Sequence, residues 1–256
     1  MRLIVFDSGI GGLSAISPYL KKGSQYDELI YIADLANLPY GSKSPSVVLA
    51  LIQKLFAKFF QENNVRENDE ILLACNTAST QIVELKNCFP KIKITSVLDL
   101  SCQAALAKLE EQKRIVVLAT TTTVKSNAYP MQLKKLGYGG QLLQIACPLF
   151  VPLVEEGFIE NKICELSIKH YLDEKIQDQD LVILGCTHYP YLKKMLNRLY
   201  PTVDFVEASD SLELKEPRKS HSLSFLLSDD NESTKKIEQA LLRLDIKKQS
   251  FKSKLI

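Results

Sequence analysis

The sequence has no tryptophan, only three histidines, and no Cys-x-x-Cys pair among its six cysteines. The histidines stand far apart, at positions 170, 188 and 221, so the spacing of neither residue type supports a structural zinc site. A chain of 256 residues that is 46% hydrophobic can build its core without disulfides, so the cysteines do not indicate a disulfide framework. We therefore expect free thiols and no bound metal.

Long apolar segments and a strong net charge are also missing. No apolar run approaches the roughly 18 residues that a membrane-spanning helix needs. The N-terminal MRLIVFDSG passes from a short apolar run to an acidic residue and glycines, unlike a signal peptide. The formal net charge is +2 at pH 7, which indicates neither a nucleic acid nor an acidic membrane as a partner. We expect a cytoplasmic protein with no membrane and no nucleic-acid partner.

Short apolar runs rich in β-branched residues predict the strands. The four clearest are near-continuous, as in parallel strands covered on both faces, and they are residues 2–6, 70–74, 114–119 and 181–185. Shorter candidates are residues 29–33, 93–98, 142–146 and 204–208. Helical spacing is found at residues 46–63, 103–113 and near 160–172. Strands that alternate with helices predict an α/β protein with parallel sheets and right-handed crossovers.

Two sequence features recur at nearly the same interval. RLIVFDSG and RIVVLATT are similar, and their residues Asp7 and Ala119 differ by 112 positions. ILLACNTAS and LVILGCTHYP are similar, and their residues Cys75 and Cys186 differ by 111 positions. We interpret this as a duplicated unit, which predicts two pseudo-symmetric parallel-sheet α/β domains facing a central cleft. Because buried parallel strands all look alike, coincidence is the alternative.

The repeat also predicts the domain boundaries. We expect residues 1–97 plus 207–256 to form the first α/β domain and residues 98–206 to form the second. The stretch 209–224 is polar and is expected to be irregular, and residues 233–248 are expected to form an amphipathic surface helix. We expect this C-terminal segment to dock back on the first domain.

Cys75 and Cys186 differ from the other four cysteines in their neighbours along the chain. Each comes directly after an apolar run and before a polar turn, Asn76-Thr77 or Thr187-His188. Side chains and backbone N–H groups at such a strand end can bind an anionic substrate and hold a thiol at a cleft. The alternative is that both are small core residues, because free cysteines are among the most buried residue types.

Two thiols on opposite sides of a bound molecule suit the inversion of a stereocentre. One removes a proton from carbon and the other delivers a proton to the opposite face, without a cofactor. Because the reverse reaction exchanges their roles, the acid and the base have to be of the same type. A single cysteine with a histidine and an aspartate would instead indicate acyl transfer.

The glycine-rich segment VFDSGIGGLS, residues 5–14, comes after the first predicted strand. Such a turn before a helix offers backbone N–H groups to an anion. It is not GxGxxG in the proper register and lacks the lysine of a P-loop, so it is weak as a nucleotide signature. Asp7 within it either orients a catalytic group or caps the helix. His188 either contacts the cleft or is structural, and Glu155 is by default a solvated helix residue.

Together these segments resemble bacterial glutamate racemases, within the Asp/Glu racemase superfamily. VFDSGIGGLS, PYGSKS, ACNTAS, VKSNAY, LFVPLVEEG and LGCTHYP occur in the order and approximate spacing of that family, over residues 1 to about 195. The pairing of ACNTAS with GCTHYP is the most specific part. Two departures stand out. This chain has Ala119-Thr120 where many members have Gly-Thr, and its segment 207–224 is shorter and more charged.

The resemblance implies a role for each matching residue. Cys75 and Cys186 match the two catalytic thiols, with Cys186 acting on the L-glutamate face and Cys75 on the D-glutamate face. Asp7 matches an acidic residue that assists the first thiol. His188 matches a residue that assists the second thiol, and Glu155 matches a further active-site acid. The residues implied to hold the carboxylates and ammonium of the substrate are Ser8, Tyr40, Gly41, Asn76, Thr77, Thr123 and Thr187.

The resemblance also implies the reaction and its setting. It implies cofactor-independent (PLP-independent) racemisation of L- and D-glutamate by two-thiol proton transfer at Cα, supplying D-glutamate for cell-wall peptidoglycan, in a homodimer. A racemase for aspartate or another acidic amino acid is the alternative, because one methylene changes binding by only about 1–3 kcal/mol. A non-catalytic amino-acid-binding protein would need neither thiol. A cysteine hydrolase using Cys186 and His188 would leave Cys75 dispensable.

Overall fold

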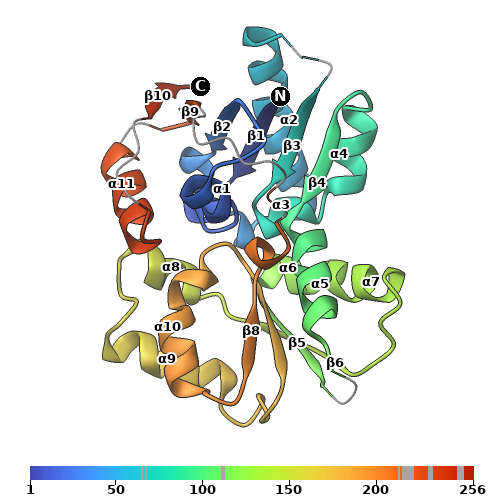
Figure 1. Cartoon of the computed structure of the whole chain (residues 1–256), viewed down its shortest axis with the longest axis vertical. Helices are drawn as coiled ribbons and strands as arrows, with labels where there is room; N and C mark the ends of the chain where they lie inside the picture. The colour runs from blue at the N-terminus through green and yellow to red at the C-terminus, as the bar shows by residue number, and fades with distance from the viewer. Residues whose placement is uncertain are drawn as a thin grey trace.

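The computed structural model describes residues 1–64, 66, 68–110, 113–212, 214, 222–229, 233–246 and 251–256 (Figure 1). These residues form two sheets, each with helices packed around it, and all of the strand pairs are parallel. The predicted fold class, α/β with two parallel-sheet domains, is therefore confirmed. We call the part built on the first sheet the first half and the other part the second half.

The first sheet has the strand order β10-β9-β2-β1-β3-β4, and the second has the order β6-β5-β7-β8. The strands of the first are β1 (Arg2–Asp7), β2 (Glu28–Ala33), β3 (Asp69–Leu73), β4 (Lys93–Ser96), β9 (Ser222–Leu227) and β10 (Lys252–Leu255). Those of the second are β5 (Ile115–Ala119), β6 (Leu142–Ala146), β7 (Leu181–Gly185) and β8 (Asp204–Val206). All eight predicted strands are present.

The structure corrects several predicted boundaries. β4 ends at Ser96 rather than at residue 98, because the Ser96 hydroxyl accepts the Asp99 N–H and caps the next helix. β8 ends at Val206. The expectation of an irregular stretch over 209–224 is wrong at its end, since β9 begins at Ser222; residues 213 and 215–221 lie outside the described residues. In β9 every second residue is buried, which is the alternation of a strand near a sheet edge.

Helices cover both sheets. They are α1 (Ser17–Lys22), α2 (Pro45–Glu62), α3 (Asn76–Ser79), α4 (Ile82–Cys88), α5 (Val97–Lys108), α6 (Thr121–Lys125), α7 (Ala128–Lys135), α8 (Phe150–Glu155), α9 (Lys162–Leu172), α10 (Lys193–Leu199) and α11 (Ser233–Arg243), with short 3-10 turns η1 (Gly11–Leu13), η2 (Leu35–Asn37), η3 (Tyr40–Ser42), η4 (Tyr189–Leu192) and η5 (Ala208–Ser211). The predicted helix at 103–113 instead occupies 97–108. None of the helices among the described residues has both the length and the apolar character of a membrane span.

The last helix is shorter than predicted from the sequence. α11 ends at Arg243 rather than at residue 248, and residues 247–248 lie outside the described residues. Asp245 has a left-handed backbone, with φ of 55°, and the Ile246 N–H turns back to the Leu241 carbonyl oxygen. A left-handed residue after the last turn ends a helix in this way.

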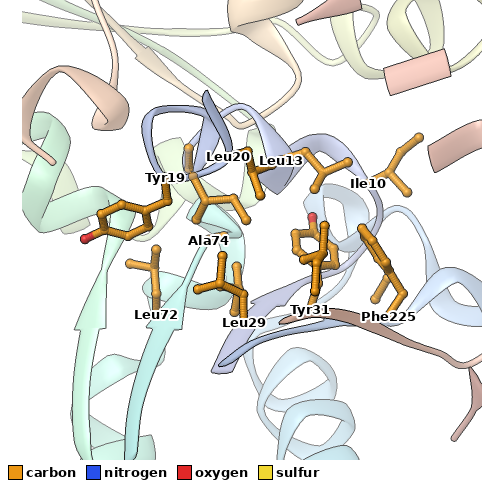
Figure 2. Close-up of a cluster of buried hydrophobic side chains, with 14 of the residues drawn as sticks. Ile10, Leu13, Tyr19, Leu20, Leu29, Tyr31, Leu72, Ala74 and Phe225 are labelled. Carbon is orange, nitrogen blue, oxygen red and sulfur yellow. The ribbon is translucent and has the colours of Figure 1, made fainter. Parts of the chain in front are cut away.

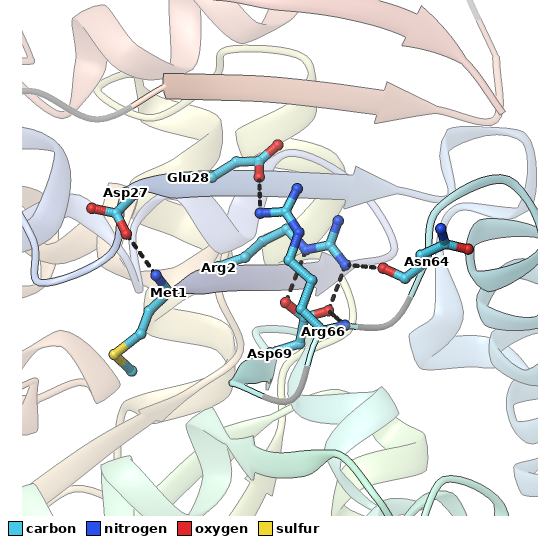
Figure 3. Close-up of polar contacts among 7 residues, drawn as sticks. All are labelled: Met1, Arg2, Asp27, Glu28, Asn64, Arg66 and Asp69. Atoms are coloured by element: carbon cyan, nitrogen blue, oxygen red, sulfur yellow. Dashed lines mark hydrogen bonds and ion pairs between the residues drawn. The ribbon is translucent and has the colours of Figure 1, made fainter.

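The two halves repeat one topology. The order β2-β1-β3-β4 of the first sheet corresponds to β6-β5-β7-β8 of the second, as the interval in the sequence predicted. Arg2 at the start of β1 pairs with Asp69 at the start of β3, with Arg2 Nε 3.0 Å from Asp69 Oδ1 (Figure 3). In the second half Arg114 Nε lies 3.0 Å from Asp180 Oδ1. Each arginine also donates to a backbone carbonyl oxygen, that of Asn64 or Lys175, so the same brace is used twice.

The main core of the first half lies on one face of its sheet. Figure 2 shows residues from the strands, such as Leu72, Tyr31 and Phe225, facing Leu13 and Leu20 from η1 and α1. Three residues of α11 belong to the same cluster: Ile237, Ala240 and Leu241. The glycine-rich segment after β1 is therefore packed between the sheet and the last helix, which holds it firmly where it meets the second half.

Candidate active site

The two halves meet at a small cavity beside the carboxyl ends of the central strands β1, β3, β5 and β7. Its volume is about 20 Å³, room for about one water molecule. Its lining comes from both halves: Ser8, Leu38, Pro39, Tyr40, Gly41, Cys75, Asn76, Thr77, Thr120, Val151, Cys186, Thr187 and His188. Ligands bind at such strand ends in α/β proteins, so this cavity is the candidate active site.

Cys75 lies between β3 and α3, where the chain leaves the sheet and forms part of the cavity wall. The residue is 6% exposed, and its Sγ lies 3.6 Å from Ser8 Oγ. Burial and the nearby Asp7 carboxylate raise the pKa of the Cys75 thiol to about 12, and the opposing contacts with the Ala78 N–H and Ser8 do not offset this. Cys75 is therefore protonated at neutral pH and suited to donate a proton.

Cys186 lies at the matching place after β7 but has different neighbours. Its Sγ is 3.9 Å from His188 Nδ1, and His188 Nε2 is 2.6 Å from Glu155 Oε1. Burial lowers the pKa of His188, but the hydrogen bonds with Cys186 and Glu155 outweigh burial and raise it well above its ordinary value. Burial raises the pKa of Glu155. Its hydrogen bond with His188 and the nearby positive charges outweigh burial and lower that pKa below its ordinary value. The contact between the two side chains therefore favours a charged His188 facing a charged Glu155.

Asp7 joins the two halves behind the cavity. Its Oδ1 accepts the Gly9 N–H at 2.7 Å, and its Oδ2 accepts the Thr187 hydroxyl at 3.0 Å. Complete burial raises the pKa of Asp7, although His188, Gly9 and Thr187 oppose that effect. The carboxylate thus acts on Cys75 through its charge while it holds the loop of Cys186 through a hydrogen bond.

Three buried threonine hydroxyls form a second link between the halves. Thr120 Oγ1 lies 3.0 Å from both Thr77 Oγ1 and Thr123 Oγ1, and the last two are 3.4 Å apart. Thr120 also caps α6 by accepting the Thr123 N–H. Gly41 fits against this group because it has no side chain, since a Cβ there would stand 2.7 Å from Thr120 Cβ. The cluster offers several hydroxyl groups to a carboxylate.

Two further lining residues are fixed by single strong contacts. Tyr40 Oη donates to Asp34 Oδ2 at 2.6 Å, and Tyr129 Oη donates to Asn76 Oδ1 at 2.6 Å. Thr122 Oγ1 lies 2.9 Å from the Gly41 carbonyl oxygen, which ties η3 to α6. The side chains of Tyr40 and Asn76 therefore hold one orientation at the cavity wall.

The structure brings most of the sequence-predicted site residues to one cavity and leaves three behind its wall. Asp7 lies behind Thr187, Thr123 behind Thr77, and Glu155 behind His188. Four lining residues were not predicted: Leu38, Pro39, Thr120 and Val151. Thr120 could have been found from the repeat, because it differs from Ser8 by the same 112 positions as Ala119 from Asp7. Leu38, Pro39 and Val151 have apolar side chains, which gave no chemical reason to select them.

The cavity wall carries proton-exchanging groups from both halves. Cys75 and Cys186 come from opposite halves, and each has its own polar neighbour, Ser8 or His188. In the described part of the chain, no group of three or more His, Cys, Asp and Glu side chains could hold a metal ion. Acid–base chemistry from two sides is what this arrangement supports.

Comparisons with known proteins agree on one family. The model of the family described as Asp/Glu/Hydantoin racemase matches residues 13–209. The glutamate racemase of Sulfurihydrogenibium sp. is 39% identical over 82% of this chain and 79% of its own length. That of Persephonella marina is 33% identical over 96% of this chain and 95% of its own. The crystal structure of glutamate racemase from Campylobacter jejuni is 30% identical, with a TM-score of 0.84 and coverage of 97% of this chain and 100% of that one.

Proposed function

The chain belongs to the Asp/Glu/Hydantoin racemase family, and we propose that it interconverts L- and D-glutamate by proton transfer at Cα between two thiols. The observation that carries the proposal is that Cys75 and Cys186, at equivalent strand ends of the two halves, line one cavity. Relatives named glutamate racemase, similar over 82% to 97% of the chain, support the choice of substrate.

In the proposed reaction Cys186 takes the Cα proton of L-glutamate as a thiolate. The electron pair of the broken C–H bond stays on the substrate as a carbanion, and Cys75 delivers its own proton to the opposite face. The reverse reaction exchanges the two roles, and the matching positions of the two sulfurs suit this requirement. His188 Nδ1 lies 3.9 Å from Cys186 Sγ, whereas Cys75, whose pKa is raised, begins as a thiol.

The main energetic difficulty is the weak acidity of a hydrogen next to an ionised carboxylate. Fixed hydrogen-bond donors in a dry site stabilise the developing charge more strongly than water does. We assign this role to Ser8, Asn76 and Thr77 on the cavity wall, with the backbone of Gly41. Tyr40 and Thr187, whose hydroxyls donate to Asp34 and Asp7, and Thr123 behind the wall hold these groups in position. The cavity of about 20 Å³ is too small for an amino acid, so the two halves have to separate for substrate entry.

Two measurements test the proposal. The wild-type protein in D₂O, without added cofactor, should incorporate deuterium at Cα of glutamate while it racemises it. Cys75→Ser and Cys186→Ser should each lower turnover by at least about 10³-fold, because removing one member of a catalytic unit costs about as much activity as removing the whole unit. Cys88→Ser is the matched control, because Cys88 is exposed and lies outside the cavity lining. Wild-type turnover in either active-site variant, measured by circular dichroism, would contradict the two-thiol reaction.

The setting of the reaction is also part of the proposal. We propose that the enzyme supplies D-glutamate for peptidoglycan in the cytoplasm and acts as a homodimer, which the family resemblance supports. A mass of 28.8 kDa by light scattering in solution would indicate a monomer instead. We propose domains of residues 1–97 plus 207–256 and of residues 98–206. Strand β9 lies beside β2 and β8 beside β7, which supports this division, and limited proteolysis would test it.

A further inference from the structure

The last helix, α11, lies across the junction of the two halves, and Figure 1 shows its end beside α8. Its apolar side is buried against the first half through Ile237, Ala240 and Leu241. The residues Lys236, Gln239 and Arg243, spaced three to four positions apart, form an adjoining side that faces a second cavity. The helix is thus anchored on the first half while charged groups point towards the second.

The second cavity lies directly behind the candidate active site. Its volume is about 20 Å³, and its lining includes Glu155 and His188 from the second half together with Lys236 and Arg243 from α11. His188 lines both cavities, with the Cys186 side on one and the Glu155 side on the other. Glu155 contacts His188, and His188 contacts Cys186. A change in α11 that moves Glu155 can therefore reach Cys186 through these two contacts.

Arg243 is held against the end of α8. Its Nη1 donates a hydrogen bond to the Val154 carbonyl oxygen at 2.9 Å. Gly157, with φ of 77°, leaves room for the guanidinium, since a Cβ at this position would stand 2.9 Å from Arg243 Nη2. Because Val154 directly precedes Glu155, this bond ties the backbone beside the Glu155 carboxylate to α11.

Glu155 faces charged and titratable groups from each element packed around it. His188 bonds to it, Lys236 and Arg243 of α11 act on it with positive charge, and Asp7 and Tyr191 also interact with it electrostatically. Its side chain is 16% exposed, so these charges are screened less than at an open surface. Burial alone would raise the pKa of Glu155, and the two cations add to the effect of His188 in lowering it.

We propose that Lys236 and Arg243 are positioning residues for the reaction, which hold the Glu155 carboxylate against His188 and so keep His188 in contact with Cys186. This inference rests on the proposed function. The two residues touch neither the substrate nor the reacting carbon. They make α11 part of the machinery for the L-glutamate face, whereas Cys75 on the D-glutamate face does not depend on them.

The test compares Lys236→Met, Arg243→Met and the double variant with Lys235→Met. Lys235 is an exposed lysine on the same helix that lines neither cavity, so its variant removes the same charge elsewhere. We expect kcat/KM of the double variant to fall about three- to tenfold, a range set by the modest strength of partly exposed charges. The acid limb of its pH profile should move to higher pH, because Glu155 then protonates more easily. Arg243→Lys keeps the positive charge, so the acid limb of its pH profile should lie closer to the wild-type position than that of Arg243→Met.

A second readout separates positioning from a general loss of structure. The two enantiomers have equal free energy, so kcat/KM is the same in both directions and cannot show which face is affected. Primary deuterium isotope effects on kcat/KM can show which face is affected. With the Cys186 side weakened, the isotope effect should rise with α-deuterated L-glutamate and fall with α-deuterated D-glutamate. A general structural defect would move neither.

The outcomes are distinguishable. Failure of the wild-type protein to racemise glutamate would overturn the proposed function itself. If the wild type racemises glutamate and the double variant has the pH profile and both isotope effects of Lys235→Met, the role of α11 is wrong. Opposite changes of the two isotope effects, with near-ultraviolet circular dichroism unchanged, would support it.

Discussion

Thr187 Oγ1 donates a hydrogen bond to Asp7 Oδ2 at 3.0 Å, so the loop that carries Cys186 is anchored on β1 of the other half. Ser14 Oγ adds a second link by donating to the Thr187 carbonyl oxygen at 2.8 Å. Both bonds lie behind the cavity rather than in it. They fix the relative position of the two halves on the side of Cys186.

Asp7→Asn should change the pH dependence of stability. Burial raises the pKa of Asp7 above 3.8, so the folded protein binds its proton more tightly than the unfolded chain does. Wild-type stability from this group is therefore present below pH 3.8 and is lost as the pH rises through the folded-state pKa. Asparagine has no such dependence, so the variant should gain stability relative to the wild type between pH 4 and pH 7. Urea denaturation at both values checks this, and an unchanged difference would contradict it.

Gly11→Ala should impair catalysis more than stability. A Cβ at position 11 would stand 2.7 Å from His188 Nδ1 and 2.9 Å from Thr187 Oγ1, so the imidazole has to move away from Cys186. Displacement by about 1 Å at a reacting group costs on the order of 10²-fold in rate. Gly139→Ala is the control, since nothing lies within 4 Å of a Cβ there. Equal turnover of the two variants would show that His188 has more freedom than this packing indicates.

Glu155→Gln should narrow the pH range of activity from the alkaline side. Burial disfavours the His188 imidazolium, and the contacts with Cys186 and Glu155 raise the pKa of His188 in spite of it. Without the Glu155 charge, that pKa falls and the imidazolium is lost at lower pH. The alkaline limb of kcat/KM should therefore move downward, in the opposite sense to the acid-limb shift expected for the α11 variants. A profile identical to the wild type would exclude His188 as the group responsible.

Asp69→Asn should destabilise the fold without a direct effect on the site. Arg2 and Asp69 have side chains only 3% and 1% exposed, so the variant leaves an arginine buried without its counter-charge. Breaking such a pair costs about 3–5 kcal/mol of unfolding free energy. Glu160→Gln, in an exposed pair with Lys194, should cost less than about 1 kcal/mol. Urea denaturation measures both, and equal values would show that burial does not set the strength of these pairs.

Much of the fold could be predicted because its strands are covered on both faces. Such strands read as continuous apolar runs, and the four runs of this kind became the central strands β1, β3, β5 and β7, while the four shorter candidates also became strands. β9 was missed because its buried and less buried residues alternate and because it comes after a polar stretch. Its place beside β2 depends on the sheet edge that β2 leaves open. The left-handed Asp245 that ends α11 is likewise invisible in an amphipathic pattern.

The sequence by itself determined the doubled unit, the two cysteines at its equivalent strand ends, and the polar residues next to them. These are local features, set by the period of apolar residues and by the chain order. Only the tertiary structure decided which partners each sulfur has. Cys186 has His188 and Glu155, whose contact spans 33 positions, whereas Cys75 has Ser8. It also placed Lys236 and Arg243 behind Glu155, because distances between remote segments depend on how the two halves pack.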